Sequence, residues 1–143
     1  MNIKIKRFDK DLPLPRRATD GAAAFDLTAR ETVIIEPGKI GYVPLNIAVE
    51  TPADHFLMVV ARSSTHKKGL IMANGIGIID PDFSGSEDEI KAAYYNFTTA
   101  AVTIEKGERI AQAIFMPAAK FEWTEVQEMQ NKTRGGFGST GEK

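Results

Sequence analysis

Two aspartates and three glycines lie close together in the segment 74–85, NGIGIIDPDFSG. A short apolar run precedes Asp80 and Asp82, so we expect a β-strand to end where the carboxylates begin. A carboxylate is ionised at neutral pH and can accept a proton from water once it is correctly placed. Glycines let a ligand approach the backbone closely. The segment is therefore either a ligand site with a carboxylate base or a plain hairpin whose turn starts at Asp80.

The spacing Asp80-x-Asp82-x-Ser84-Gly85 also matches the first half of a calcium-binding EF-hand loop. The twelfth position of that loop requires a bidentate carboxylate, but Lys91 occupies it in this chain. The flanking residues favour strands rather than the helices that an EF-hand needs. The sequence therefore excludes an EF-hand at this segment.

An arginine and two hydroxyls, Arg62, Ser63 and Ser64, follow the apolar run 56–60. Arginine has a planar fork that matches phosphate oxygens, and donors at the start of a helical turn favour an anion. Alternatively, the serines only cap a helical turn over residues 63–68 and Arg62 only pairs with a surface carboxylate. For this tripeptide alone, the structural interpretation is the simpler one.

Asp26 and Gln112 are polar residues within apolar runs that resemble strands. A lone charge such as Asp26 must be paired, linked to a metal or exposed on the outer face of a strand, and exposure is the default expectation. Gln112 alternates with apolar neighbours and could point to either face of its strand. Neither residue indicates a function by itself.

The chain ends in a glycine-rich segment, residues 135–141, with four glycines, two hydroxyls and Phe137. Successive backbone N–H groups of glycines can surround an anion, and an aromatic ring offers a flat face for a base. Composition alone favours a flexible tail, whereas the single aromatic residue among the glycines favours a binding role.

Short β-rich runs separated by glycine and proline make up most of the chain. No stretch supplies the ten or more helical residues of a βαβ crossover, so we expect an all-β jelly roll, sandwich or barrel with at most one short helix. The pattern ends after residue 126, which predicts a β domain over residues 1–126 and a flexible arm over 127–143. The expected strands are residues 3–7, 24–28, 32–35, 41–49, 56–60, 77–79, 90–97, 101–104, 109–115 and 121–126.

The overall composition limits the classes of function. A chain of 143 residues fits a single domain. With no cysteine, the chain has no disulfide, thiolate zinc site or cysteine nucleophile. A formal net charge of −1 gives no overall field for nucleic acid or membrane, so anion binding must be local and the ligand small. The N-terminus lacks the apolar region of a signal peptide, and no apolar run is long enough to span a bilayer. We expect a cytoplasmic protein.

Five segments resemble, in order, the five motifs of the trimeric dUTPase (deoxyuridine triphosphatase) family. They are AAAFDLTA, ARSSTHKKGL, NGIGIIDPDFSG, KGERIAQAIF and RGGFGSTG, and they span residues 22–141. Each motif alone is weak, but five in the family order are a specific signal. The resemblance implies a jelly-roll subunit, a homotrimer with active sites at subunit junctions, a Mg²⁺ cofactor, and hydrolysis of dUTP to dUMP and pyrophosphate.

The motif positions imply roles for individual residues. Asp80 would be the general base that activates water for attack on the α-phosphorus, and Gln112 would assist at the phosphates. Asp26 would help to hold the water shell of Mg²⁺. The implied substrate-binding residues are Asn74, Gly77 and Ile79 for the uracil, Phe83 for the deoxyribose, and Arg62, Ser63 and Ser64 for the phosphates.

The glycine-rich arm would close over the site of a neighbouring subunit. Phe137 would stack on uracil, and Gly138, Ser139 and Thr140 would lie at the phosphates. The family's arm arginine usually stands five residues before the stacking aromatic. Lys132 occupies that position here and Arg134 stands three before, so the resemblance leaves both open as the phosphate ligand.

Two departures from the family pattern concern the site. Ala24 and Ser64 stand where the family usually has glycines, and Ser86-Glu87-Asp88 is inserted before Glu89. Two other functions share part of the pattern. The chain could be a dCTP deaminase-related enzyme, a group that also has the Arg-Ser-Ser element. Alternatively, it could be a dUTPase-like protein that binds nucleotide to regulate a partner. Intact Asp80, Gln112 and the glycine-rich end favour a dUTPase over both.

Overall fold

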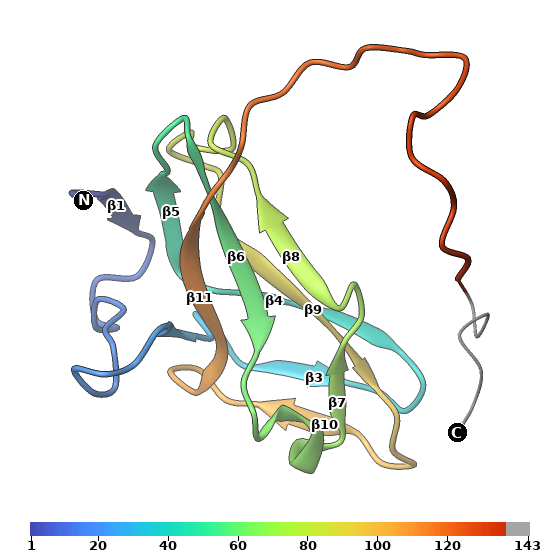
Figure 1. Cartoon of the computed structure of the whole chain (residues 1–143). Coiled ribbons are helices and arrows are strands. Elements are labelled where there is room, and N and C mark those ends of the chain that lie inside the picture. Colours follow the sequence, from blue (N-terminus) through green and yellow to red (C-terminus); the bar gives the residue numbers. More distant parts are fainter. Residues whose placement is uncertain (137–143) are drawn as a thin grey trace.

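The structure is a computed structural model that describes residues 1–136 (Figure 1). Over these residues the chain consists of short strands and one 3-10 turn, η1. The elements are β1 (Lys4–Arg7), β2 (Phe25–Thr28), β3 (Val33–Ile35), β4 (Ile40–Pro44), β5 (Ile47–Glu50), β6 (His55–Ala61), η1 (Thr65–Lys68), β7 (Leu70–Met72), β8 (Ile76–Ile79), β9 (Lys91–Asn96), β10 (Val102–Ile104) and β11 (Arg109–Pro117).

The strands form two main sheets that lie one behind the other (Figure 1). One has the order β2-β11-β6-β8 and the other β4-β9-β7, and the pairs β1-β5 and β10-β3 complete the domain. All of these pairings are antiparallel. The arrangement confirms the prediction of an all-β, jelly-roll-like fold.

Alternation along the strands separates the core from the outer face of the four-stranded sheet. Leu57 and Val59 of β6 and Ala111 of β11 are buried between the layers, and burying a side chain of leucine size stabilises the fold by about 1.5–3 kcal/mol. The intervening residues face outward. Gln112 lies directly opposite Asp26 of β2 in the register, so both side chains project from the same outer face.

The predicted strand over residues 41–49 is two strands, β4 and β5, separated at Leu45-Asn46. Asn46 has a φ of 68°, in the left-handed region that interrupts an extended strand. Its side chain accepts a hydrogen bond from the N–H of Asp9 and donates one to the carbonyl of Asp9. These bonds stabilise the unusual backbone conformation and break the strand.

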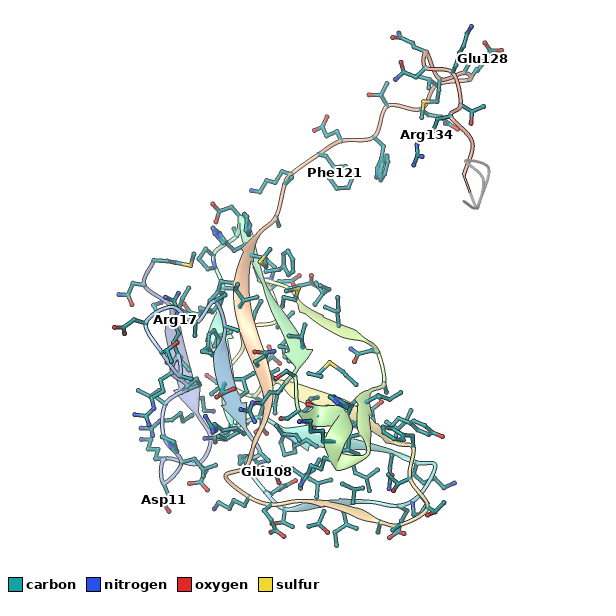
Figure 2. The ribbon with its side chains drawn as sticks, turned by 60° about the horizontal axis from the view of Figure 1, so that its bottom comes forward. Asp11, Arg17, Glu108, Phe121, Glu128 and Arg134 are labelled. Carbon is teal, nitrogen blue, oxygen red and sulfur yellow. The ribbon has the colours of Figure 1, made fainter. Side chains whose placement is uncertain are left out.

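The predicted strand over residues 121–126 is wrong. These residues form no strand, and Phe121 and Trp123 are 69% and 88% exposed. Alternation alone cannot make a strand without a neighbour to accept its backbone hydrogen bonds, and none lies beside this segment within residues 1–136. Figure 2 shows the chain from Phe121 through Glu128 to Arg134 extending away from the sheets.

The region after β6 also differs from prediction in detail. The expected helical turn over residues 63–68 is the 3-10 turn η1, and Gly69 ends it with a φ of 85°. Among the described residues, the Ser64 side chain makes no capping bond. The three-residue strand β7 was not predicted, because its short run follows the turn directly.

No helix in residues 1–136 is long and apolar enough to cross a membrane.

Candidate active site

The Asp26 carboxylate lies between two arginines at one end of the four-stranded sheet. Its Oδ1 accepts from Arg62 Nε at 2.9 Å and its Oδ2 accepts from Arg109 Nη1 at 3.0 Å. A further bond at 3.1 Å joins Arg62 Nη1 to the carbonyl of Arg109. The Asp26 side chain is 17% exposed, so the default expectation of an exposed, unpaired aspartate is wrong. Strand pairing brings the arginines to it.

Gln112 extends this polar cluster along the same face. Its neighbours Ala111 and Ala113 are buried, so its side chain points outward. The side-chain amide donates to the carbonyl of Ala61 at 3.0 Å, at the end of β6. Ser63 and Ser64 follow Arg62 directly in the chain and are exposed. We call Asp26, Arg62, Arg109 and Gln112 the phosphate cluster, because it combines two guanidinium groups and an amide donor on one surface.

A depression of about 660 Å³ adjoins the phosphate cluster. Arg16, Arg17 and Arg109 line it together with Asp26. Three guanidinium groups around one carboxylate leave an excess of positive charge, which suits a polyanion. None of these three arginines was predicted as a site residue from the sequence. Arg109 and Asp26 are 83 residues apart in the chain, and only the pairing of β2 with β11 reveals their contact.

A second depression, of about 700 Å³, includes three of the residues that the resemblance assigns to the nucleoside. Asn74, Ile79 and Phe83 line it, and Arg30 and Glu89 lie in the same wall. Asn74 Nδ2 donates to the carbonyl of Ile76 at 3.2 Å. We call this depression the nucleoside pocket. An amide, backbone groups and an aromatic ring are suited to a flat polar base and a sugar.

Asp80 follows directly after β8 and is exposed. Its carbonyl accepts from the N–H of Phe83 at 3.1 Å, so Asp80-Pro81-Asp82 does begin a turn. The turn and the site are therefore compatible, because the turn places Phe83 in the wall of the nucleoside pocket. Gly77, also assigned to the nucleoside, pairs with Val59 in the ladder between β6 and β8.

The inserted residues are fixed to the rest of the loop and to β1. Asp88 Oδ2 accepts from the N–H of Gly85 at 2.7 Å. Lys6 Nζ donates to the carbonyl of Ser86 and to Glu87 Oε1, the latter at 3.2 Å. The insert thus connects the loop after Asp80 with the N-terminal strand.

Buried and paired groups near the site have shifted pKa values. Burial raises the pKa of the Tyr94 phenol well above its ordinary value, and its hydroxyl donates to the carbonyl of Ile110 at 2.7 Å. Tyr94 is therefore a neutral donor that supports the start of β11. The hydrogen bond to Glu89 raises the pKa of Arg30, which stays a cation at any physiological pH.

The two halves of the expected site do not meet within one described chain. The phosphate depression and the nucleoside pocket share no lining residue in the part of the chain that the structure describes. Lys132 and Arg134 lie in the exposed segment beyond β11. The expected contacts of Phe137, Gly138, Ser139 and Thr140 lie outside the described residues.

Within residues 1–136, no group of three or more His, Cys, Asp or Glu side chains could hold a metal ion by itself. Asp26 is nevertheless a hard oxygen donor beside the positively charged depression. Mg²⁺ commonly binds one or two carboxylates and completes its shell with water and substrate phosphates. The donor set here fits that mode of binding.

Comparison with known proteins agrees with this geometry. A dUTPase family model matches residues 10–141. The deoxyuridine 5'-triphosphate nucleotidohydrolase of Lactococcus lactis is 40% identical over 132 residues, covering 90% of this chain and 87% of that protein. The enzyme of the same name from Hydrogenobaculum sp. is 40% identical over 147 residues and 100% of both chains. The crystal structure of dUTPase from Streptococcus mutans superposes with a TM-score of 0.76 at 33% identity, covering 83% of this chain and 98% of that one. The protein therefore belongs to the dUTPase family.

Proposed function

We propose that this protein hydrolyses dUTP to dUMP and pyrophosphate. The observation that supports this best is the nucleoside pocket, in which Asn74, Ile79 and Phe83 come together beside the exposed Asp80. A phosphate cluster with two arginines and a glutamine stands on the same chain. These are the two kinds of recognition that a nucleoside triphosphate requires.

The nucleoside pocket selects a deoxyuridine. The Asn74 amide, which has both donors and an acceptor, and the backbone of Gly77 and Ile79 bind the uracil edge. Phe83 is 41% exposed, so its ring is available to pack under the deoxyribose and to crowd a 2'-hydroxyl. A site that hydrogen-bonds one base edge rejects analogues that leave its polar groups unpaired.

Asp80 acts as the general base. Its carboxylate takes a proton from a water molecule, and the water oxygen forms a bond to the α-phosphorus. The bond between the α-phosphorus and the bridging oxygen breaks, so pyrophosphate leaves with that oxygen and dUMP keeps the oxygen from water. The proton passes from Asp80 to solvent. Geometry governs this step, since the base must lie within hydrogen-bond reach of the water.

The phosphate side stabilises the charge of the triphosphate. Arg62, Ser63, Ser64 and Gln112 donate hydrogen bonds to phosphate oxygens. Asp26 would hold Mg²⁺ through the water shell of the ion, together with substrate phosphates. When bound, Mg²⁺ supplies positive charge that neutralises the phosphate oxygens. The lone pairs of Asp26 that the arginines do not use are available for this role.

A homotrimer would bring the two halves together. The phosphate cluster of one copy would face the nucleoside pocket of another, and the arm over residues 127–143 would close over the junction. In the closed arm, Phe137 would stack on uracil, and Lys132 or Arg134 would be a further phosphate ligand. The arm residues at the phosphates would be Gly138, Ser139 and Thr140. Support comes from the separation of the two depressions. Ile76 and Ile78, on the outer face of β8, are 51% and 54% exposed and are suited to a subunit contact.

In the cell, this activity would limit uracil incorporation into DNA and supply dUMP for thymidylate synthesis. We place the protein in the cytoplasm, acting on free nucleotide without stable binding to nucleic acid or membrane. Its formal net charge of −1 supports a small ligand rather than a polyanionic polymer.

The test is pyrophosphate release from a panel of dUTP, dCTP, dTTP and UTP in the presence of Mg²⁺. We expect rapid release from dUTP and little from the others. Ammonia production from dCTP would instead identify a deaminase. Absence of both products, together with tight binding of a non-hydrolysable dUTP analogue, would identify a nucleotide-dependent regulator.

A further inference from the structure

The carboxylate of Glu89 is buried at the end of the loop that follows Asp80. Its side chain is 8% exposed. Oε1 accepts from Arg30 Nε at 2.7 Å and from the N–H of Asn46 at 3.0 Å, and Oε2 accepts from Arg30 Nη2 at 3.0 Å. A bidentate pair of this kind fixes the relative orientation of both groups as well as their distance.

Asn46, which lies between β4 and β5, joins the Arg30–Glu89 pair to that part of the chain. It is 1% exposed with a φ of 68°, and its side chain bonds the N–H of Asp9 at 2.7 Å and the carbonyl of Asp9 at 3.0 Å. Two backbone hydrogen bonds also join Ile90 to the β4–β5 connection. The N–H of Leu45 donates to the carbonyl of Ile90, and the N–H of Ile90 donates to the carbonyl of Ile47, each at 2.9 Å. We call Arg30, Asn46 and Glu89 the clamp.

The clamp holds the far end of the loop that contains Asp80 and Phe83. The near end is Ile79, which is fixed in the ladder opposite Leu57. Between the two ends, the loop folds into turns closed by backbone bonds from Phe83 to Asp80 and from Asp88 to Gly85, each 3.1 Å long. Those local turns set the shape of the loop, whereas its direction depends on both anchored ends.

We propose that the clamp positions Asp80 and Phe83, so that the nucleoside pocket is formed before substrate binds. Arg30 and Glu89 line that pocket with Phe83, and both lie outside the five motif segments. They act through Asp80 and Phe83 as positioning residues. The proposal rests on the proposed dUTP hydrolysis, in which a misplacement of about 1 Å can cost roughly a hundredfold in rate.

The Glu89→Gln variant tests this directly. Glutamine keeps the shape and an acceptor for the Asn46 N–H but removes the charge and the fork with Arg30. We expect dUMP affinity and kcat for dUTP each to fall about tenfold. The affinity for pyrophosphate with Mg²⁺ should be unchanged, because Asp26 and Arg109 of the phosphate cluster line a different depression from Glu89. Arg30→Lys keeps the positive charge but not the fork, and should reduce dUMP affinity about threefold.

The Glu50→Gln variant is the matched control. It makes the same substitution in the exposed pair between Glu50 and Lys4, 2.8 Å apart on β5 and β1, and should change neither nucleotide affinity nor rate. If Glu89→Gln does not fold, the same measurements on Arg30→Lys decide the question.

The possible outcomes separate the two proposals. A wild-type protein that releases no pyrophosphate from dUTP overturns the proposed function, whatever the variants do. With an active wild type, unchanged dUMP affinity and kcat in Glu89→Gln overturn the clamp. An equal fall in affinity for dUMP and for pyrophosphate also overturns it, because such a loss indicates a general structural role.

Discussion

The phosphate cluster and the nucleoside pocket are held in place by different means. The phosphate cluster takes Asp26, Arg109 and Gln112 from β2 and β11, where strand pairing fixes the backbone, and Arg62 from the residue directly after β6. Ion pairs between Asp26, Arg62 and Arg109 then fix the side chains. The nucleoside pocket instead takes Phe83 from a loop, with Asp80 at the loop's start, and the direction of that loop depends on the clamp.

This difference suggests that the two regions contribute differently to nucleotide recognition. A sheet end presents a rigid set of donors, which suits phosphates because every nucleotide has them. A loop can change in length and anchoring without disturbing the sheet. In this chain the loop contains an insert, and a partly buried ion pair with Arg30 anchors its far end. We therefore expect changes in the loop to alter base and sugar selection, and changes in the cluster to weaken all nucleotides alike.

The largest effect should come from Asp80→Asn, which removes the proposed base and leaves the phosphate cluster intact. The amide cannot take a proton from water, so kcat should fall about 10³-fold. Affinity for dUMP should change by less than about twofold, since the side chain keeps its size. Steady-state pyrophosphate release and equilibrium binding of dUMP measure the two quantities.

The control for this change is Asp20→Asn, the same substitution at an exposed position far along the chain from the loop. It should retain wild-type kcat. If Asp80→Asn retained more than a tenth of the activity, Asp80 would not be the base.

A second, smaller effect should follow from Asp26→Asn in the phosphate cluster. The neutral amide loses the charge that holds the guanidinium groups of Arg62 and Arg109, so kcat/KM should fall about a hundredfold for every nucleotide that the enzyme accepts. Stability should fall by about 1.5–3 kcal/mol, the range for hydrogen bonds to a charged group. Denaturant unfolding and the nucleotide panel measure both. A loss confined to dUTP would contradict the proposed division between the two regions.

Much of the fold could be predicted from residue patterns, because alternation marks a half-buried strand wherever a partner exists. The pattern failed where tertiary contacts decide. Asn46 breaks the run 41–49 because its side chain bonds Asp9, which is 37 residues earlier. Residues 121–126 alternate as a strand does, but they have no neighbouring strand within residues 1–136.

The site was partly predictable for a similar reason. Asn74, Asp80 and Phe83 lie within one short segment, so sequence spacing alone places them together. Arg109 and Glu89 were missed, because their partners Asp26 and Arg30 are 83 and 59 residues away. Charged residues within strands and loops have many possible partners, and only the register of the sheets selects one.

A third prediction addresses the selectivity of the nucleoside pocket. Phe83→Ala removes the ring that we propose crowds the 2'-position, so the ratio of kcat/KM for UTP to that for dUTP should rise about tenfold. Affinity for pyrophosphate should not change, because Phe83 does not line the phosphate depression. Competition assays with the two nucleotides measure the ratio. If the ratio stayed constant, another residue would set the sugar preference.

The smallest effect concerns Asp9, at the outer edge of the clamp. The pKa of the Asp9 carboxyl is lowered below its ordinary value, mainly by a hydrogen bond from Lys106 Nζ, 2.6 Å away. A second hydrogen bond, from the N–H of Asp11, lowers it further. A lowered pKa in the folded state means that the stabilisation is fully present above the ordinary pKa of an aspartate and is lost as the pH falls through the folded value. Asp9→Asn should therefore lower the Tm slightly at pH 7, and the difference from wild type should vanish as the pH falls through the lowered pKa of Asp9. Thermal unfolding across that pH range measures it. Asp9→Asn keeps the backbone bonds with Asn46, so a difference that persisted at the lowest pH would show that the charge of Asp9 does not account for its contribution.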